Sequence, residues 1–142
     1  MSAVRLKSIS ELKNFVQKNF SALVQPRQIL LLKGEMGAGK TEFVKQLVAL
    51  AGGDAATSPS FALHNTYVAS GLSIEHLDLY RLETEDDLQS IGFWDLFENE
   101  NALIVIEWAD RVAVQKFPMT WKKINLKFKV LDETTREITF EP

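Results

Sequence analysis

Hydrophobic residues recur at every third or fourth position in two stretches of the chain, a spacing that predicts amphipathic helices. The first stretch opens with a capping-box pattern at residues 8–11, and we expect its helix to run to about Val24, because Pro26 cannot continue it. The second helix is expected to end at Gly52-Gly53. A further capping pattern at residues 84–87 predicts a third, shorter helix.

Between and after these helices, apolar residues run continuously or alternate with polar residues, as they do in β-strands. The runs QILLLK (28–33) and ALIVI (102–106) are typical of strands that are buried on both faces of a parallel sheet. Alternation predicts the other strands over residues 61–69, 72–80 and, as an antiparallel pair, 122–140. The order of elements predicts an α/β fold: a single P-loop domain over residues 1–142, with a mixed central β-sheet flanked by helices and with C-terminal antiparallel strands.

Composition narrows the classes of protein to which the chain can belong. The chain contains no cysteine, which excludes disulfides and thiolate metal sites, and its net charge of −3 argues against a broad nucleic-acid footprint, although a local basic patch remains open. The first residues contain no apolar segment of the secretory type, and no apolar run approaches the length of a membrane span. We therefore expect a cytoplasmic protein with no membrane contact.

The stretch GEMGAGKT, residues 34–41, matches the phosphate-binding pattern G-x-x-x-x-G-K-[ST] in full. Glycines let the backbone N–H groups approach phosphate oxygens, Lys40 supplies a positive charge beside the β- and γ-phosphates, and the Thr41 hydroxyl can bind Mg²⁺. A glycine turn with a surface lysine is the alternative. The position of the pattern, between a predicted strand and a predicted helix, favours nucleotide binding.

Hydrolysis also requires a carboxylate, and two lie at the ends of predicted strands. Glu107 follows ALIVI and could hold Mg²⁺, directly or through water, or orient the attacking water; a solvated glutamate is the alternative. Asp78 is expected near Thr41 or a metal-bound water, although a salt bridge with Arg81 or a lysine is equally compatible with the pattern. His76 is a lone histidine on a predicted strand, and such a residue is more often packed or hydrogen-bonded than catalytic.

The polar loop TSPS, residues 57–60, occupies the place of a nucleotide-sensing switch in P-loop proteins, although the pattern also fits a simple turn. The base-reading motifs of GTPases and the arginine-rich lid of small-molecule kinases do not occur in the sequence. The residues therefore favour a slow ATPase that acts through partner proteins. A nucleotide-sensing interaction module and a small-molecule P-loop kinase are the alternatives.

Five motifs occur in the order seen in one family, TsaE (also called YjeE), and together they resemble it closely. They are GEMGAGKT, TSPSF (57–61), HLDLYRL (76–82), IGF-W (91–94) and IEW (106–108). The resemblance implies a Mg²⁺-dependent P-loop ATPase with low intrinsic activity, which supports threonylcarbamoyladenosine modification of tRNAs that read codons starting with A. It implies TsaD and TsaB as partners, with tRNA reached indirectly through their complex.

The resemblance also implies roles for particular residues. It places the phosphates on Met36, Gly37, Ala38, Gly39, Lys40 and Thr41, and Mg²⁺ on Thr41 and Glu107. It makes Lys40, Asp78 and Glu107 the catalytic residues and puts Trp108 beside the nucleotide. Leu12 stands where the family commonly has threonine, so an adenine contact from this segment would come through Ser10, and Arg136 is expected to approach the nucleotide from the C-terminal hairpin.

Overall fold

The computed structural model describes residues 2–55, 64–69, 71–80, 82, 84–109, 112 and 114–141. These residues contain one eight-stranded sheet in the order β1-β8-β7-β2-β6-β5-β4-β3. The strands are β1 (Ser2–Leu6), β2 (Gln28–Gly34), β3 (Asp54–Ala55), β4 (His64–Ala69), β5 (Leu72–Asp78), β6 (Ala102–Glu107), β7 (Lys122–Val130) and β8 (Arg136–Glu141). The four central strands, β7, β2, β6 and β5, run parallel, and the outer strands pair antiparallel, so the predicted mixed sheet is confirmed.

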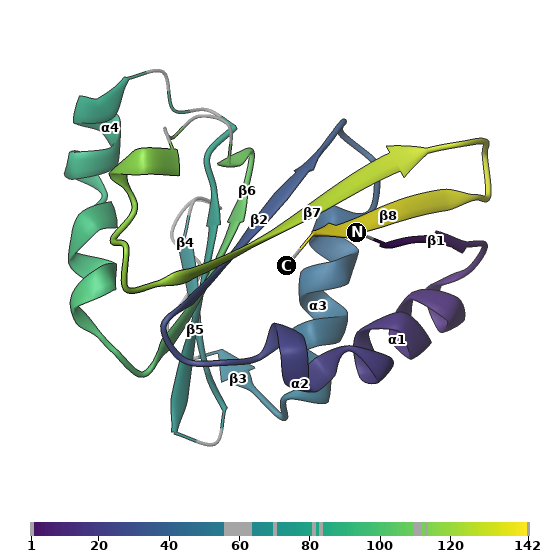
Figure 1. Ribbon diagram of the computed structural model, residues 1–142, viewed down its shortest axis with the longest axis horizontal. Helices are drawn as coiled ribbons and strands as arrows, with labels where there is room; N and C mark the ends of the chain where they lie inside the picture. The colour runs from purple at the N-terminus through teal and green to yellow at the C-terminus, as the bar shows by residue number, and fades with distance from the viewer. Residues whose placement is uncertain are drawn as a thin grey trace.

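Helices cover both faces of this sheet (Figure 1). One face is covered by α1 (Ile9–Lys18), α2 (Phe20–Leu23) and α3 (Lys40–Leu50), and the other by α4 (Glu85–Ser90) and the 3₁₀ helix η1 (Phe93–Glu98). Strand β2 shows why both faces are apolar: Leu30 and Leu32 pack in the cluster with α1 and α3, whereas Ile29 and Leu31 pack in the cluster with α4 and η1. A further 3₁₀ helix, η3, spans Val114–Lys116.

The predicted capping boxes explain where two of the helices begin. The Ser8 hydroxyl accepts a hydrogen bond from the Glu11 backbone N–H at the start of α1. At the start of α4, Thr84 and Asp87 each accept a hydrogen bond from the other's backbone N–H, which completes a reciprocal capping box. Both predicted helix starts are confirmed.

One expectation about the N-terminal third was wrong, and one strand was not predicted. The helix expected to continue to about Val24 is divided at Asn19, whose side-chain amide donates to the carbonyl oxygen of Phe15 at 2.8 Å, so the side chain competes with the helical backbone pattern. Strand β1 was not predicted, because five residues with a single buried side chain, that of Leu6, give little alternation. It is held by antiparallel pairing with β8, far away in the sequence.

The parallel strands bring three predicted functional segments to one edge of the sheet. The glycine-rich loop follows β2, and Leu32 near the end of that strand is paired with Glu107 at the end of β6. Asp78, at the end of β5, is paired with Glu107 on its other side. The carboxyl edge of the parallel strands is where α/β proteins bind ligands. No helix in the described part of the chain is long and apolar enough to cross a membrane.

Candidate functional site

The glycine-rich loop joins β2 directly to α3, as the sequence predicts. Strand β2 ends at Gly34 and α3 begins at Lys40. Gly34 has φ +148°, and a Cβ at this position would lie 2.4 Å from the carbonyl oxygen of Phe128, so no larger residue fits where β2 passes β7. Gly39 caps α3 with φ +105°, a left-handed conformation. A helix N-terminus that follows a glycine-rich loop is a common anion-binding site, because its first backbone N–H groups lie outside the helical hydrogen-bond pattern.

Lys40 is held at the base of this loop, with only 4% of its surface exposed. Its ammonium group donates a hydrogen bond to the carbonyl oxygen of Gly34 and lies 4.0 Å from the centroid of the Trp108 ring. Trp108 adopts φ +60°, and the Tyr80 ring packs against it at a centroid distance of 5.0 Å. Trp108 therefore lies beside the loop, next to the cation that the sequence assigns to the phosphates.

Thr41 and Glu107 face each other across the carboxyl edge of the sheet. The Thr41 hydroxyl lies 3.3 Å from each of the two Glu107 carboxylate oxygens, longer than the usual O–H···O distance of about 2.7–2.8 Å. Glu107 is buried, with 3% of its surface exposed, at the end of β6. A hydroxyl and a carboxylate arranged in this way fit a small divalent cation such as Mg²⁺, which takes few protein ligands and completes its shell with phosphate and water.

His76 is the residue at this site to which the sequence pattern gave least weight. Its Nε2 atom lies 2.6 Å from Oε2 of Glu107. The signal that could have found it is the two-residue spacing of His76 and Asp78, which puts both side chains on one face of β5, beside the strand that ends in Glu107. The structure therefore brings Thr41, His76 and Glu107 together, because Thr41 and His76 both contact the Glu107 carboxylate.

Asp78 lies on the same cavity of about 360 Å³ as Met36, Thr41, Glu107 and Trp108. Its Oδ1 atom accepts a hydrogen bond of 3.0 Å from the backbone N–H of Tyr80, which fixes the turn after β5. The alternative salt bridge with Arg81 lies outside the described residues, as does the predicted switch loop, residues 57–60. Asp78 thus shares a cavity with Thr41 and is tied to the backbone of its own turn.

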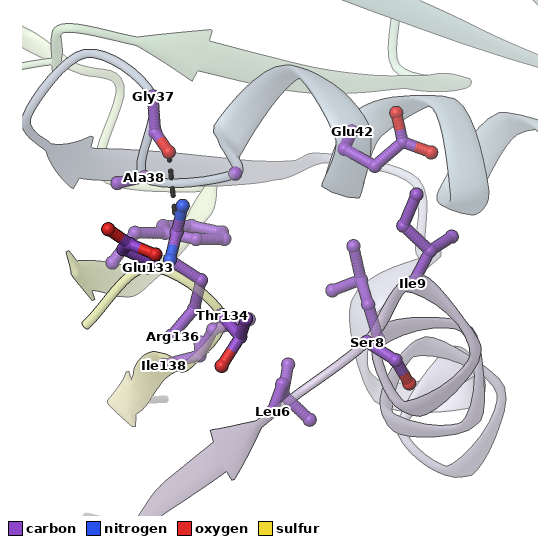
Figure 2. Close-up of a pocket in the computed structure, with 13 residues that line it drawn as sticks. Leu6, Ser8, Ile9, Gly37, Ala38, Glu42, Glu133, Thr134, Arg136 and Ile138 are labelled. Carbon is purple, nitrogen blue, oxygen red and sulfur yellow. Dashed lines mark hydrogen bonds between the residues drawn. The ribbon is translucent and has the colours of Figure 1, made fainter. Parts of the chain in front are cut away.

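A second cavity, of about 350 Å³, is also lined in part by the glycine-rich loop (Figure 2). Apolar and polar side chains from four segments line it: Leu6, Ser8, Ile9, Leu12, Gly37, Ala38, Gly39, Glu42, Phe128, Glu133, Thr134, Arg136 and Ile138. Ser8 and Ile9 are among these lining residues, whereas Ser10, the residue expected from the sequence, is not among them. The cavity depends on the docking of α1 and of the C-terminal hairpin, so spacing along the chain could not reveal it.

Arg136 connects the C-terminal hairpin to the glycine-rich loop, as Figure 2 shows. Its Nε atom donates to the carbonyl oxygen of Gly37 at 3.3 Å, and one terminal nitrogen donates to the carbonyl oxygen of Asp132 at 2.9 Å. Hydrogen bonds from the backbone N–H groups of Thr134 and Thr135 lower the pKa of Asp132 and hold the turn of the hairpin. Arg136 therefore lies between the hairpin and the glycine-rich loop, and its approach to a nucleotide stays a prediction.

A second buried glutamate, Glu75, lies on the opposite face of β5 from His76. Its carboxylate accepts hydrogen bonds from Thr66 at 2.5 Å and Ser73 at 2.9 Å, and one oxygen lies 2.9 Å from His64 Nε2. Burial raises the pKa of Glu75. The hydrogen bonds from His64, Thr66 and Ser73, together with the charge of His64, lower the pKa by more than burial raises it, so the pKa falls below its ordinary value. Within the described segments, no three His, Cys, Asp or Glu residues are grouped closely enough to bind a metal by themselves.

The strand, glycine-rich loop and helix at the carboxyl edge of a largely parallel central sheet define a P-loop nucleotide-binding fold. The sequence model of the family described as "Threonylcarbamoyl adenosine biosynthesis protein TsaE" matches residues 6–138. The chain belongs to this family.

Individual relatives agree with the family match. The chain is 33% identical over 138 residues to a protein of Rickettsia bellii described as "tRNA threonylcarbamoyladenosine biosynthesis protein TsaE", covering 96% of this chain and 93% of that one. It is 30% identical over 126 residues to the protein of the same description from Bacillus subtilis, covering 88% and 76% of the two chains. The crystal structure of Bacillus subtilis YdiB superposes with a TM-score of 0.72 at 27% identity, covering 98% of this chain and 83% of that chain.

Proposed function

We propose that the protein binds ATP with Mg²⁺ and hydrolyses it slowly, in support of threonylcarbamoyladenosine modification of tRNAs that read codons starting with A. The observation that carries this proposal is the pair formed by Thr41 and Glu107, whose hydroxyl and carboxylate face each other at 3.3 Å beside the phosphate loop. The family match supports the pathway. TsaD and TsaB are proposed as partners, and tRNA as an indirect one, in the cytoplasm and away from membranes.

In this proposal the triphosphate lies along the loop from Met36 to Thr41, with backbone N–H groups and Lys40 opposing its negative charge. The base lies in the cavity of Figure 2, which is lined by α1, the loop and the hairpin. Ser8 and Ile9 line that cavity and Ser10 follows them in α1, while Arg136 extends from the hairpin to the loop. The chain, over residues 1–142, acts as one ATP-binding domain.

Thr41 and Glu107 would hold Mg²⁺, because a hydroxyl and a carboxylate are oxygen ligands of the kind it prefers. When bound, Mg²⁺ neutralises part of the phosphate charge. Lys40 stabilises the charge that develops on the transferred phosphoryl group, while Glu107 and Asp78 orient the attacking water from the ends of two neighbouring strands. Trp108 covers Lys40 at 4.0 Å and restricts its access to water.

Replacement of Lys40 by alanine tests nucleotide binding. Loss of a charge-assisted contact should weaken ATP binding about 10- to 100-fold and abolish support of tRNA modification by TsaD and TsaB. Lys127→Ala is the matched control, because Lys127 is an exposed lysine of β7 that lies beside Glu141. Full tRNA modification with Lys40→Ala would contradict the proposal.

Two further measurements separate the alternatives. If a non-hydrolysable ATP analogue supports many cycles of tRNA modification as well as ATP does, the protein is a nucleotide-sensing module. If phosphate is transferred to an added metabolite rather than to water, it is a small-molecule kinase.

A further inference from the structure

His76 is a half-buried polar side chain that the proposed function does not use. It lies on β5 opposite Val105 of β6, with 11% of its side chain exposed. Its Nε2 atom lies 2.6 Å from Oε2 of Glu107, the shortest contact that the Glu107 carboxylate makes among the described residues. An imidazole this close to the proposed metal ligand has a direct effect on the orientation of that ligand.

The chemistry of the two groups determines which atom carries the proton. A carboxylate that acts as a metal ligand is ionised and only accepts hydrogen bonds, so in that state Nε2 of His76 donates to Oε2 of Glu107. Thr41 cannot fix the carboxylate in the same way, because its hydroxyl oxygen lies 3.3 Å from both carboxylate oxygens and its one proton can be donated to only one of them at a time. The orientation of the Glu107 carboxylate therefore depends on His76.

We propose that His76 is a positioning residue for Glu107. It holds Oε2 through its Nε2–H group and leaves Oε1 as the oxygen available to the ion bound with the nucleotide. Hydrogen bonds to a metal ligand from a second residue commonly fix the ligand's rotation, and their loss costs about 10- to 100-fold in metal affinity or activity. The inference rests on the proposed function, because it assigns a task within the same Mg²⁺ and ATP site.

Three substitutions at His76 separate positioning from packing. Glutamine carries an N–H donor near the place of Nε2, asparagine carries one closer to the backbone, and leucine carries none. We expect His76→Leu and His76→Asn to raise the Mg²⁺ concentration for half-maximal hydrolysis about 10-fold and to lower kcat, with unchanged binding of ADP in the absence of Mg²⁺. His76→Gln should restore most of both quantities. Equal impairment of the glutamine and leucine variants would overturn the proposal, as would an unchanged Mg²⁺ requirement in His76→Leu.

His64→Leu is the matched control, because it removes the other histidine of the chain and that histidine contacts a different glutamate, Glu75. This variant should be less stable than the original protein but should keep the original Mg²⁺ requirement. A change in Mg²⁺ requirement equal to that of His76→Leu would show that the effect is general and would overturn the proposal. Thermal unfolding of each variant identifies those that do not fold.

A second readout needs no nucleotide, metal or activity. The chain contains two histidines, so His64→Leu assigns the imidazole resonances of His76 by nuclear magnetic resonance. We expect a slowly exchanging Nε2-bound proton on His76 that is lost in Glu107→Ala; its absence from the original protein would overturn the proposal. If this proton is present but the original protein does not hydrolyse ATP, the His76–Glu107 contact stands and the proposed function fails.

Discussion

Two buried glutamates, Glu75 on β5 and Glu107 on β6, each lie beside a histidine, yet their surroundings differ. Glu75 is in contact with three donor side chains at 2.5 to 2.9 Å. Glu107 has one contact of 2.6 Å, with His76, and two long contacts of 3.3 Å with a single hydroxyl. Glu107 also lines a cavity of about 360 Å³ at the carboxyl edge of the sheet.

The difference separates a structural carboxylate from one that is available to a ligand. Three well-placed donors use much of the hydrogen-bonding capacity of Glu75 and stabilise its charge within the β4–β5 pair. Glu107 is fixed on one side by His76, while the geometry toward Thr41 leaves room for an ion or a water. Burial and a neighbouring histidine are therefore insufficient to identify a functional glutamate, and the distances to the remaining partners distinguish the two.

The largest expected difference between the two glutamates is in hydrolysis. Glu107→Gln should lower the rate of ATP hydrolysis about 100-fold or more, because the neutral amide holds the cation poorly and does not orient water as a carboxylate does. Glu75→Gln should change the rate little. Steady-state phosphate release at saturating ATP measures both variants, and similar losses in the two would remove the functional distinction between them.

The next largest expected difference is in stability, where the loss of Glu75 should have a larger effect than the loss of Glu107. Glu75→Ala leaves the donors of His64, Thr66 and Ser73 without their acceptor and should lower the free energy of unfolding by about 2 kcal/mol. Glu107→Ala should cost less, because water in the adjoining cavity can reach the vacated position. Urea unfolding of both variants provides the comparison, and a larger cost for Glu107→Ala would contradict it.

The smallest expected effect is a dependence of stability on pH. The pKa of Glu75 is lowered in the folded protein, so the unfolded chain binds more protons at this position and stability rises with pH. The contribution of Glu75 is fully present above the pKa of the unfolded chain and is lost as the pH falls through the lowered pKa of the folded protein. The difference in unfolding free energy between the original protein and Glu75→Gln should therefore shrink in acid, and a difference that grows in acid would be contrary to the assignment.

Much of this architecture could be predicted from the sequence, because the local signals and the fold agree. QILLLK and ALIVI are apolar enough to indicate central parallel strands, and the glycine-rich loop between strand and helix indicates a P-loop. The break at Asn19 and strand β1 were missed because they depend on a side-chain amide and on a distant pairing partner. Local periodicity contains neither signal.

Most residues of the candidate site could be predicted from the sequence, but the contacts between them could not. The roles of Lys40 and Thr41 are predicted by the glycine-rich motif, and that of Glu107 by its position at the end of a strand. The parallel register of the strands brings the three residues to one edge of the sheet. His76 looked like an ordinary strand residue, because its role depends on β5 lying beside β6. The cavity of Figure 2 joins residues from both ends of the chain, and short-range spacing cannot place those residues together.

The central claim is that Thr41 and Glu107 act together on one Mg²⁺ ion during ATP hydrolysis. A double-mutant cycle with Thr41→Ala, Glu107→Gln and the combined variant tests this claim, with hydrolysis measured at saturating ATP over a range of Mg²⁺ concentrations. Residues that act as a unit give non-additive losses, so the combined variant should be about as slow as the slower single variant. Losses that multiply in the combined variant would show that the two residues act independently and would contradict the account.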